Sequence, residues 1–243
     1  MSQHYILTID NGTQSVRALL FDVEGNLIGK GKEELEPYFS QKPGWAEQHP
    51  EYYWASLKKA CDQLWATVDI DRTLIKGMSI TTQRGTVVNL DRDGQPLRPA
   101  IVWLDQRHAE IEGPVKGVWG LLVKIAKVGD VVKRFREKAQ AVWIKQNQPD
   151  VWEKTHKFLL LSGYLTYQFT GKYVDSVGCQ VGYIPFDYKK LRWASKSDWR
   201  WGVLPLTKDM LPELVQPGEA LGSVTAQAAQ YTGIPEGTPV IAS

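Results

Sequence analysis

An acid, a glycine and two hydroxyls stand together in the short corner IDNGTQSVRALLFD, residues 9–22, between two apolar strands. Main-chain amides in a tight turn commonly bind phosphate, and small residues let the phosphate approach closely. Gly12 permits that approach because it lacks a Cβ, while Thr13 and Ser15 add hydroxyl donors. Asp10 ends the first strand, where a carboxylate suits Mg²⁺ held through water, since magnesium keeps much of its hydration shell. These residue types predict a site for a magnesium-bound phosphate.

The same corner has a second interpretation, in which it is only a β-hairpin turn. Asn11 and Gly12 would then be present for a turn that needs positive φ. The pattern GxxxxGK[ST] occurs nowhere in the chain, which excludes a P-loop of the Walker type. Arg17 favours the phosphate interpretation, because its guanidinium brings positive charge toward a terminal phosphate.

Length and composition describe an ordinary globular protein. The 243 residues suit one large domain or two small ones, and the hydrophobic fraction of 43% suffices for a packed core. A net charge of +2 makes no case for nucleic acid as a partner. Two distant cysteines without a CxxC pattern favour a reducing compartment and argue against a disulfide scaffold or a zinc site. The sequence shows no signal peptide and no apolar stretch near the ~20 residues of a membrane span, so we expect a cytoplasmic protein without a membrane partner.

The surrounding elements are predicted from periodicity and turn signals, and together they indicate an α/β domain. Three consecutive strands joined by short turns open the chain as an antiparallel meander. Pro50 suits the first position of the helix that follows, where no amide donor is needed. The expected strands are 4–10, 16–22, 27–36, 75–81, a hairpin over 86–103 that turns at Asp93 and Gly94, and 238–243. The expected helices are 49–68, 118–128, 130–148, 150–171 and 225–233, while 172–205 is left without assigned elements.

Two of the expected helices have a clear apolar face, because their apolar residues recur at helical spacing. In the helix over 49–68 these residues are Trp54, Leu57, Cys61, Leu64 and Trp65. In the helix over 118–128 they are Val118, Leu121, Leu122 and Ile125.

Five ordered segments resemble one family of proteins. Residues 9–28 resemble the first phosphate-binding hairpin of the superfamily of sugar kinases, actin and heat-shock ATPases, and within it the FGGY family of carbohydrate kinases. PGWAEQHPEYYWASL, PAIVWLDQR, LLLSGYLTYQFTGKYVDSVG and GIPEGTPVIAS resemble later segments of the same family, in the same order. The resemblance implies a ribonuclease-H-like α/β fold, as in actin-like ATPases, with a mixed sheet and flanking helices. It also implies that residues 1–243 are the N-terminal domain of a two-domain kinase.

The resemblance further implies the cofactors and the residues that bind them. The family uses ATP and Mg²⁺, and the residues corresponding to its phosphate hairpin are Asp10, Asn11, Gly12, Thr13, Gln14, Ser15 and Arg17. Asp10 corresponds to the catalytic residue that holds magnesium through water. The residues corresponding to the substrate side are Gln83, Arg84, Trp103 and Asp105.

Gln83-Arg84-Gly85 differs from better-known sugar kinases at a position that contacts the substrate. Glycerol kinases have Gln-Arg-Glu there and xylulokinases have Gln-Met-His, so both glycerol and xylulose are in doubt and the sugar stays open. Arg84 is suited to donate two hydrogen bonds to vicinal hydroxyls, and a solvated surface arginine is the alternative. Trp103 suits the C–H face of a polyol, with a core tryptophan as the alternative. Asp175 is either an acid near the active site or the stabiliser of a turn.

The family places its catalytic base, an aspartate, just after the strand that begins in TPVIAS, so we expect it beyond Ser243. The C-terminal nucleotide domain is also expected to be absent from this chain, so we expect the chain to be inactive alone. Without that domain an apolar wall would be uncovered, and it is a possible site for a homodimer. The predicted function is ATP-dependent phosphorylation of a sugar or polyol hydroxyl. The alternative is a degenerate kinase half that binds sugar or nucleotide as a regulatory module. A ribonuclease-H-like nuclease is disfavoured, because clustered carboxylates for two metals are not evident.

Overall fold

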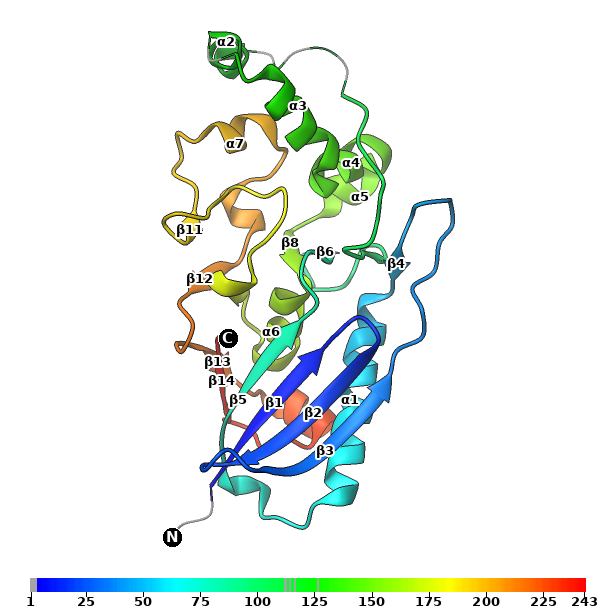
Figure 1. Ribbon diagram of the computed structural model, residues 1–243, viewed down its shortest axis with the longest axis vertical. Helices are drawn as coiled ribbons and strands as arrows, with labels where there is room; N and C mark the ends of the chain where they lie inside the picture. The colour runs from blue at the N-terminus through cyan, green and yellow to red at the C-terminus, as the bar shows by residue number, and fades with distance from the viewer. Residues whose placement is uncertain (1–3, 112, 114, 116, 126) are drawn as a thin grey trace.

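The computed structural model describes residues 4–243 except 112, 114, 116 and 126. Its largest sheet is mixed and has six strands in the order β13-β14-β5-β1-β2-β3 (Figure 1). β1 (Tyr5–Asn11), β2 (Ser15–Asp22) and β3 (Leu27–Glu34) form the predicted antiparallel meander. β5 (Ile75–Thr82) pairs parallel to β1, β14 (Pro239–Ile241) pairs parallel to β5, and β13 (Ala220–Ser223) completes the edge antiparallel to β14.

Two helices pack against this sheet, namely α1 (Pro50–Thr67) and α6 (Leu161–Thr170), and α8 (Ala226–Thr232) packs against both of them. Alternate residues of the strands, including Leu7, Ile9 and Leu20, are buried in the core between them, as the period of two in a strand requires. Gly31 lets α1 approach β3, because a Cβ on that residue would lie 1.9 Å from the main-chain oxygen of Ala60.

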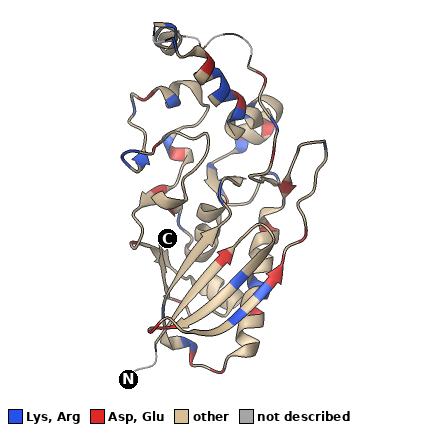
Figure 2. Ribbon diagram, in the orientation of Figure 1, with Lys and Arg blue, Asp and Glu red and all other residues tan. Residues whose placement is uncertain are grey.

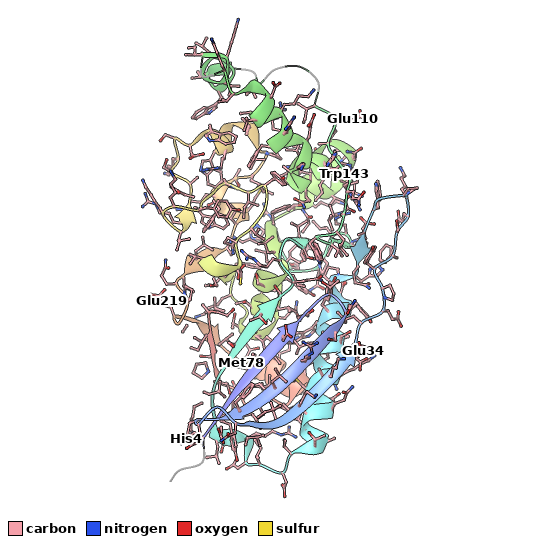
Figure 3. All side chains as sticks on the ribbon, in the orientation of Figure 1. His4, Glu34, Met78, Glu110, Trp143 and Glu219 are labelled. Atoms are coloured by element: carbon pink, nitrogen blue, oxygen red, sulfur yellow. The ribbon has the colours of Figure 1, made fainter. Side chains whose placement is uncertain are left out.

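A smaller sheet with its own core lies between the six-stranded sheet and the helices at the other end of the molecule (Figure 1). Its order is β4-β7-β6-β8, with β4 at Glu47–Gln48, β7 at Ala100–Ile101, β6 at Val87–Leu90 and β8 at Lys157–Leu160. The helices of this end are α2 (Gly117–Ile125), α3 (Gly129–Lys138), α4 (Gln140–Asn147), α5 (Pro149–Lys154) and α7 (Trp199–Val203). Figure 3 labels Met78 and Trp143, which belong to the two separate cores.

Short elements complete the chain, most of them in or next to the segment 172–205 that the sequence left unassigned. They are β9 (Val174–Ser176) paired with β12 (Glu213–Val215), β10 (Phe186–Asp187) paired with β11 (Arg192–Trp193), and the 3₁₀ turns η1 (Arg72–Leu74), η2 (Val177–Cys179) and η3 (Lys208–Met210). β9 and η2 follow α6, so this segment connects the two ends of the molecule.

The mixed sheet with flanking helices confirms the predicted fold class. The single helix predicted over 150–171 is wrong, because β8 interrupts it by pairing antiparallel with β6, Val87 opposite Leu160. The helix predicted over 130–148 is divided into α3 and α4 by the extended backbone of Ala139. α2 covers most of the helix predicted over 118–128, of which residue 126 and the side chain of Leu122 lie outside the described residues.

Candidate functional site

The corner between β1 and β2 is a tight hairpin in which Asp10 stands opposite Arg17. The main-chain amide of Gly12 donates to the carbonyl oxygen of Ser15 at 3.0 Å, which closes the turn. Arg17 Nη1 donates to Asp10 Oδ2 at 2.9 Å, and the Thr81 hydroxyl donates to the other carboxylate oxygen at 3.4 Å. Both charged side chains remain accessible, at 36% for Asp10 and 44% for Arg17. The carboxylate therefore faces solvent at the end of β1, as a metal-water ligand must.

The predicted phosphate residues divide into two groups by exposure. Thr13 and Gln14 are exposed at the tip of the hairpin, whereas Asn11 is fully buried and Ser15 is 5% exposed. Both polar atoms of the Asn11 amide are buried without a hydrogen-bond partner among the described residues. The side chains of Asn11 and Ser15 are therefore not exposed for contact with a phosphate, unlike those of Thr13 and Gln14.

Thr13 connects the hairpin tip to the two predicted substrate segments. Its hydroxyl donates to Gln83 Oε1 at 3.2 Å and accepts from Trp103 Nε1 at 3.1 Å. The amide of Gln83 also donates to the carbonyl of Asn11 at 2.7 Å. Trp103 is 50% exposed, so the alternative of a core tryptophan is wrong. Residues from three separate chain segments thus meet at one edge of the sheet.

Tyr53 on α1 supports this junction and was missed in the sequence. Gln83 Nε2 donates to its hydroxyl oxygen at 2.8 Å. Burial raises the pKa of the Tyr53 hydroxyl to about 12, although the hydrogen bond from Gln83 acts in the opposite direction. The apolar face predicted for this helix does not include Tyr53. The one signal in the sequence is that Tyr53 stands between two other aromatic residues in PEYYW.

Arg84 is exposed and follows Gln83 in the turn after β5. Burial raises the pKa of the Cys179 thiol to about 11, and the positive charge of Arg84 acts in the opposite direction. Gly85 has φ of +81°, a conformation that costs an L-residue roughly 1–2 kcal/mol, and a Cβ on it would lie 3.5 Å from that of Trp103. A larger side chain at position 85 would therefore be strained in this backbone.

Asp105 lies in a buried ionic network. Its carboxylate accepts from Arg107 Nη2 at 2.6 Å, from Arg107 Nε at 2.8 Å and from the amide of Ala46 at 2.7 Å. The side chains of Asp105 and Arg107 are each 2% exposed. Because its oxygens are occupied in the interior, direct contact between Asp105 and a substrate hydroxyl is not supported. Asp105 instead holds the segment that carries Trp103.

Glu47 extends this network to a second arginine. It accepts from Arg107 Nη1 at 3.0 Å and from Arg98 Nη2, and all three side chains are at most 4% exposed. Burial lowers the pKa of the Arg98 guanidinium to about 10, against the charge of Glu47, which raises it. The Arg107 guanidinium also lies 4.0 Å from the ring of Trp45. The charged residues of PGWAEQHP and PAIVWLDQR thus bind one another.

Asp175 is a second buried acid, 1% exposed at the junction of β9 and η2. It accepts hydrogen bonds from Ser162 Oγ and Gln180 Nε2, both at 2.8 Å. The hydroxyl of the neighbouring Ser176 donates to the carbonyl oxygen of Ser243 at 2.6 Å. The Ser243 hydroxyl in turn donates to the carbonyl oxygen of Ile80 at 3.0 Å. Asp175 therefore stabilises the turn that joins β9 to the ends of β14 and β5, which favours the turn alternative.

The free energy of unfolding is expected to fall between about pH 4 and pH 6 because of Asp175. Burial raises the pKa of this carboxyl from 3.8 to about 6, while the Cys179 thiol beside it has its pKa raised to about 11 and stays neutral. Within that window the folded state keeps a proton that the unfolded state has lost, so stability decreases as pH rises, by on the order of 3 kcal/mol. Urea unfolding of the wild type and Asp175→Asn at pH 4, 5, 6 and 7 checks this. A difference between the two that does not vary with pH would contradict it.

The described part of the chain contains no cluster of three His, Cys, Asp or Glu side chains placed to hold a metal ion. Asp10 is therefore the carboxylate available at the hairpin, and it fits a magnesium ion whose other ligands are water and phosphate oxygens. The carboxylate cluster of a two-metal nuclease is not found among these residues either.

The edge that carries Asp10, Thr13 and Gln83 is open. Thr13 and Gln83 line a cavity of only about 10 Å³. A much larger cavity of about 850 Å³ lies among α1, α6, α8 and the turn at Asp93, and none of the predicted site residues lines it. Among the described residues, the predicted site residues thus do not enclose a cavity large enough for a sugar or a nucleotide.

Comparison with known proteins identifies the family of this chain. Residues 5–243 match the model of the FGGY family of carbohydrate kinases, N-terminal domain. The glycerol kinase of Thermococcus gammatolerans is 32% identical over 224 residues, which cover 90% of this chain and 44% of that enzyme. The crystal structure of xylulose kinase from Rhodospirillum rubrum superposes with a TM-score of 0.79 at 23% identity, covering 98% of this chain and 48% of that one. Plasmodium falciparum glycerol kinase with ADP has a TM-score of 0.74 at 24% identity, covering 99% and 48%. The chain spans about half the length of the curated relatives it matches.

Proposed function

Because the chain belongs to the FGGY family of carbohydrate kinases, we propose that it supplies one wall of an active site that transfers the γ-phosphoryl group of ATP to a sugar or polyol hydroxyl. The observation that carries the proposal is the pair of hydrogen bonds at the Thr13 hydroxyl, which donates to Gln83 Oε1 and accepts from Trp103 Nε1. They join the phosphate hairpin to the substrate segments, and phosphoryl transfer requires both reactants at one place.

On the phosphate side, the exposed hairpin tip offers main-chain amides at Thr13 and Gln14, while the amide of Gly12 closes the turn on Ser15. Asp10 orients the water shell of a magnesium ion, and Arg17, 2.9 Å from it, adds positive charge beside the phosphates. When bound, magnesium neutralises charge on the phosphate oxygens. The hydrogen bond from Arg17 holds the Asp10 carboxylate at the same edge.

On the substrate side, Arg84 donates hydrogen bonds to adjacent hydroxyls and the exposed indole of Trp103 packs against the C–H face of the polyol. Gln83 is held by Tyr53 and Thr13, so it positions the loop. Gly85 provides neither the carboxylate of glycerol kinases nor the imidazole of xylulokinases. The proposal therefore names the class of substrate, a sugar or polyol, and no single compound.

A second domain is proposed to close the open edge and to supply the catalytic base and the site for adenosine. The relatives are about twice as long as the region they share with this chain. The Ser243 hydroxyl donates to the carbonyl oxygen of Ile80 in β5, the strand that leads to Gln83, and this contact supports a base that follows β14. Location in the cytoplasm is a prediction that accompanies this proposal.

The proposal is tested with a sugar panel and Mg-ATP. A full-length version is expected to phosphorylate at least one compound among glycerol, tetritols, pentoses and hexitols, whereas the 243-residue chain alone is expected to form no product. Product from the chain alone would contradict the division between two domains. Full-length protein that binds a sugar and never phosphorylates it would favour the regulatory module instead.

Arg84→Ala in the full-length kinase is expected to raise KM for the sugar about 10- to 100-fold, because charged hydrogen bonds contribute roughly 1.5–3 kcal/mol each. KM for ATP should change little, since Arg84 lies on the substrate side. Steady-state kinetics with each substrate varied in turn measures both constants. Arg92→Ala, an exposed arginine in the 91–96 turn, is the matched control. An unchanged KM for the sugar would rule out Arg84 as a substrate ligand.

A further inference from the structure

Large apolar side chains are unusually exposed on α2 and the start of α3, residues 117–138, which we term the α2–α3 hairpin. Among the described residues, four of the five most exposed large apolar side chains belong to it: Val118 at 75%, Ile125 at 68%, Val131 at 65% and Leu121 at 60%. Exposed apolar residues scattered singly are ordinary, but a contiguous group marks an interaction surface.

α2 has a second apolar face, and that face is already occupied. Val115 and Val123 pack against the core of the small sheet. Trp119 lies so close to α7 that a Cβ on Gly202 would be 2.0 Å from its ring. The residues Val118, Leu121 and Ile125 follow the spacing i, i+3 and i+7, so they form the opposite, outward face. Packing within this chain therefore does not account for them.

The hairpin is also strongly basic. Residues 117–138 contain six Lys or Arg and two Asp or Glu, a net charge of +4, whereas the whole chain has +2. Lys133 and Glu137, 3.8 Å apart, form the single ion pair within the described part of the hairpin. Figure 2 shows these cations along α3. The positive charge of the protein is thus concentrated beside its exposed apolar face.

A concave space of about 510 Å³ lies between the two helices, lined by Val115, Leu121 and Val123 together with Lys124, Lys133 and Arg136. Nε of Arg136 is buried without a hydrogen-bond partner among the described residues. The volume falls in the range of roughly 300–1,000 Å³ of small-molecule sites. Apolar walls with cations beside them match an amphiphile with an anionic head group.

We propose that the α2–α3 hairpin docks this protein on an anionic lipid bilayer. The side chains of Leu121 and Ile125 enter the interface, and the lysines contact the phosphate head groups. A second copy of the chain is a poorer occupant, because a two-fold contact would bring the same cations together. α2 lies at the far end of the molecule from the β1–β2 hairpin, so a flat surface can reach it (Figure 1). Among the described residues no helix is long and apolar enough to cross a membrane, which leaves the protein on its surface.

Vesicle flotation of the purified 243-residue chain tests the proposal. Vesicles with 30% phosphatidylglycerol in phosphatidylcholine are expected to bind at least tenfold more protein than pure phosphatidylcholine, and 0.5 M NaCl should remove most of the difference. Leu121→Ser with Ile125→Ser, and separately Lys124→Glu with Lys133→Glu, should each lower binding about tenfold. Val23→Ser and Lys30→Glu change exposed residues near the β2–β3 turn and serve as matched controls that bind like the wild type. Circular dichroism confirms that each variant is folded.

Three outcomes would overturn the proposal. The first is no binding to anionic vesicles. The second is equal binding to neutral and anionic vesicles, which would indicate non-specific apolar adhesion. The third is a dimer in gel filtration that Leu121→Ser with Ile125→Ser dissociates without any change in vesicle binding, which would assign the hairpin to a second copy. None of these outcomes depends on the kinase proposal.

Discussion

Asp10→Asn in the full-length kinase is expected to lower kcat by about 10²- to 10³-fold, the size of effect seen when one preorganised electrostatic group is removed from an active site. The amide keeps the shape of the side chain and loses the charge that holds a magnesium-bound water. The free energy of unfolding should change by no more than about 1 kcal/mol, because the Asp10–Arg17 pair is 36% and 44% exposed. Steady-state kinetics at saturating sugar and urea unfolding measure the two effects separately.

Asp22→Asn is the matched control for Asp10→Asn. Asp22 ends the same two-stranded hairpin at its opposite end, where it accepts hydrogen bonds from Asn26. Its replacement is expected to leave kcat unchanged. Added magnesium should restore part of the activity of Asp10→Asn, because a weakened metal site is filled by mass action. A kcat near that of the wild type would remove Asp10 from the metal site.

The parts of the fold that sequence reasoning predicted well are those set by local signals. The β1–β2 corner depends on a turn of three residues, Gly12 to Gln14, and the first helix begins at Pro50 as predicted. β8 could not be found in the same way. Its four residues lie within a longer segment predicted as helix, and pairing with β6, about seventy residues earlier, makes them a strand. Pairing between distant segments can override the local preference of a segment for helix, and the local sequence does not reveal such pairing.

The same distinction applies to the site. The resemblance named Thr13, Gln83 and Trp103, and the structure brings these three side chains within hydrogen-bonding distance. The resemblance could not show that the carboxylate oxygens of Asp105 already accept hydrogen bonds. One of these bonds comes from the amide of Ala46, which lies 59 positions away in the sequence. A charged side chain in a sequence suggests solvent or substrate, and burial against a distant partner is visible only in three dimensions.

Glu47 carries the second large effect, on stability. Glu47→Ala is expected to lower the free energy of unfolding by about 3–5 kcal/mol, the cost of removing one partner from a buried ion pair. Glu47 is 4% exposed and lies between Arg98 and Arg107, whose side chains are 3% and 2% exposed. Its loss leaves the Arg98 guanidinium buried with no carboxylate, while Arg107 keeps Asp105. Urea unfolding monitored by circular dichroism measures the change.

Asp62→Ala provides the comparison for Glu47→Ala, because it also removes the acid of an ion pair, but the pair with Lys58 is exposed at 53% and 37%. Such pairs contribute at most about 1 kcal/mol, so the two variants should differ several-fold in effect. Glu47→Gln should fall between them, since its amide oxygen still accepts a hydrogen bond from one arginine. A loss below about 1 kcal/mol for Glu47→Ala would show that water or local rearrangement satisfies both arginines. In that case the network would not hold the Trp103 segment rigidly, and the affinity for the sugar would have to come from Arg84.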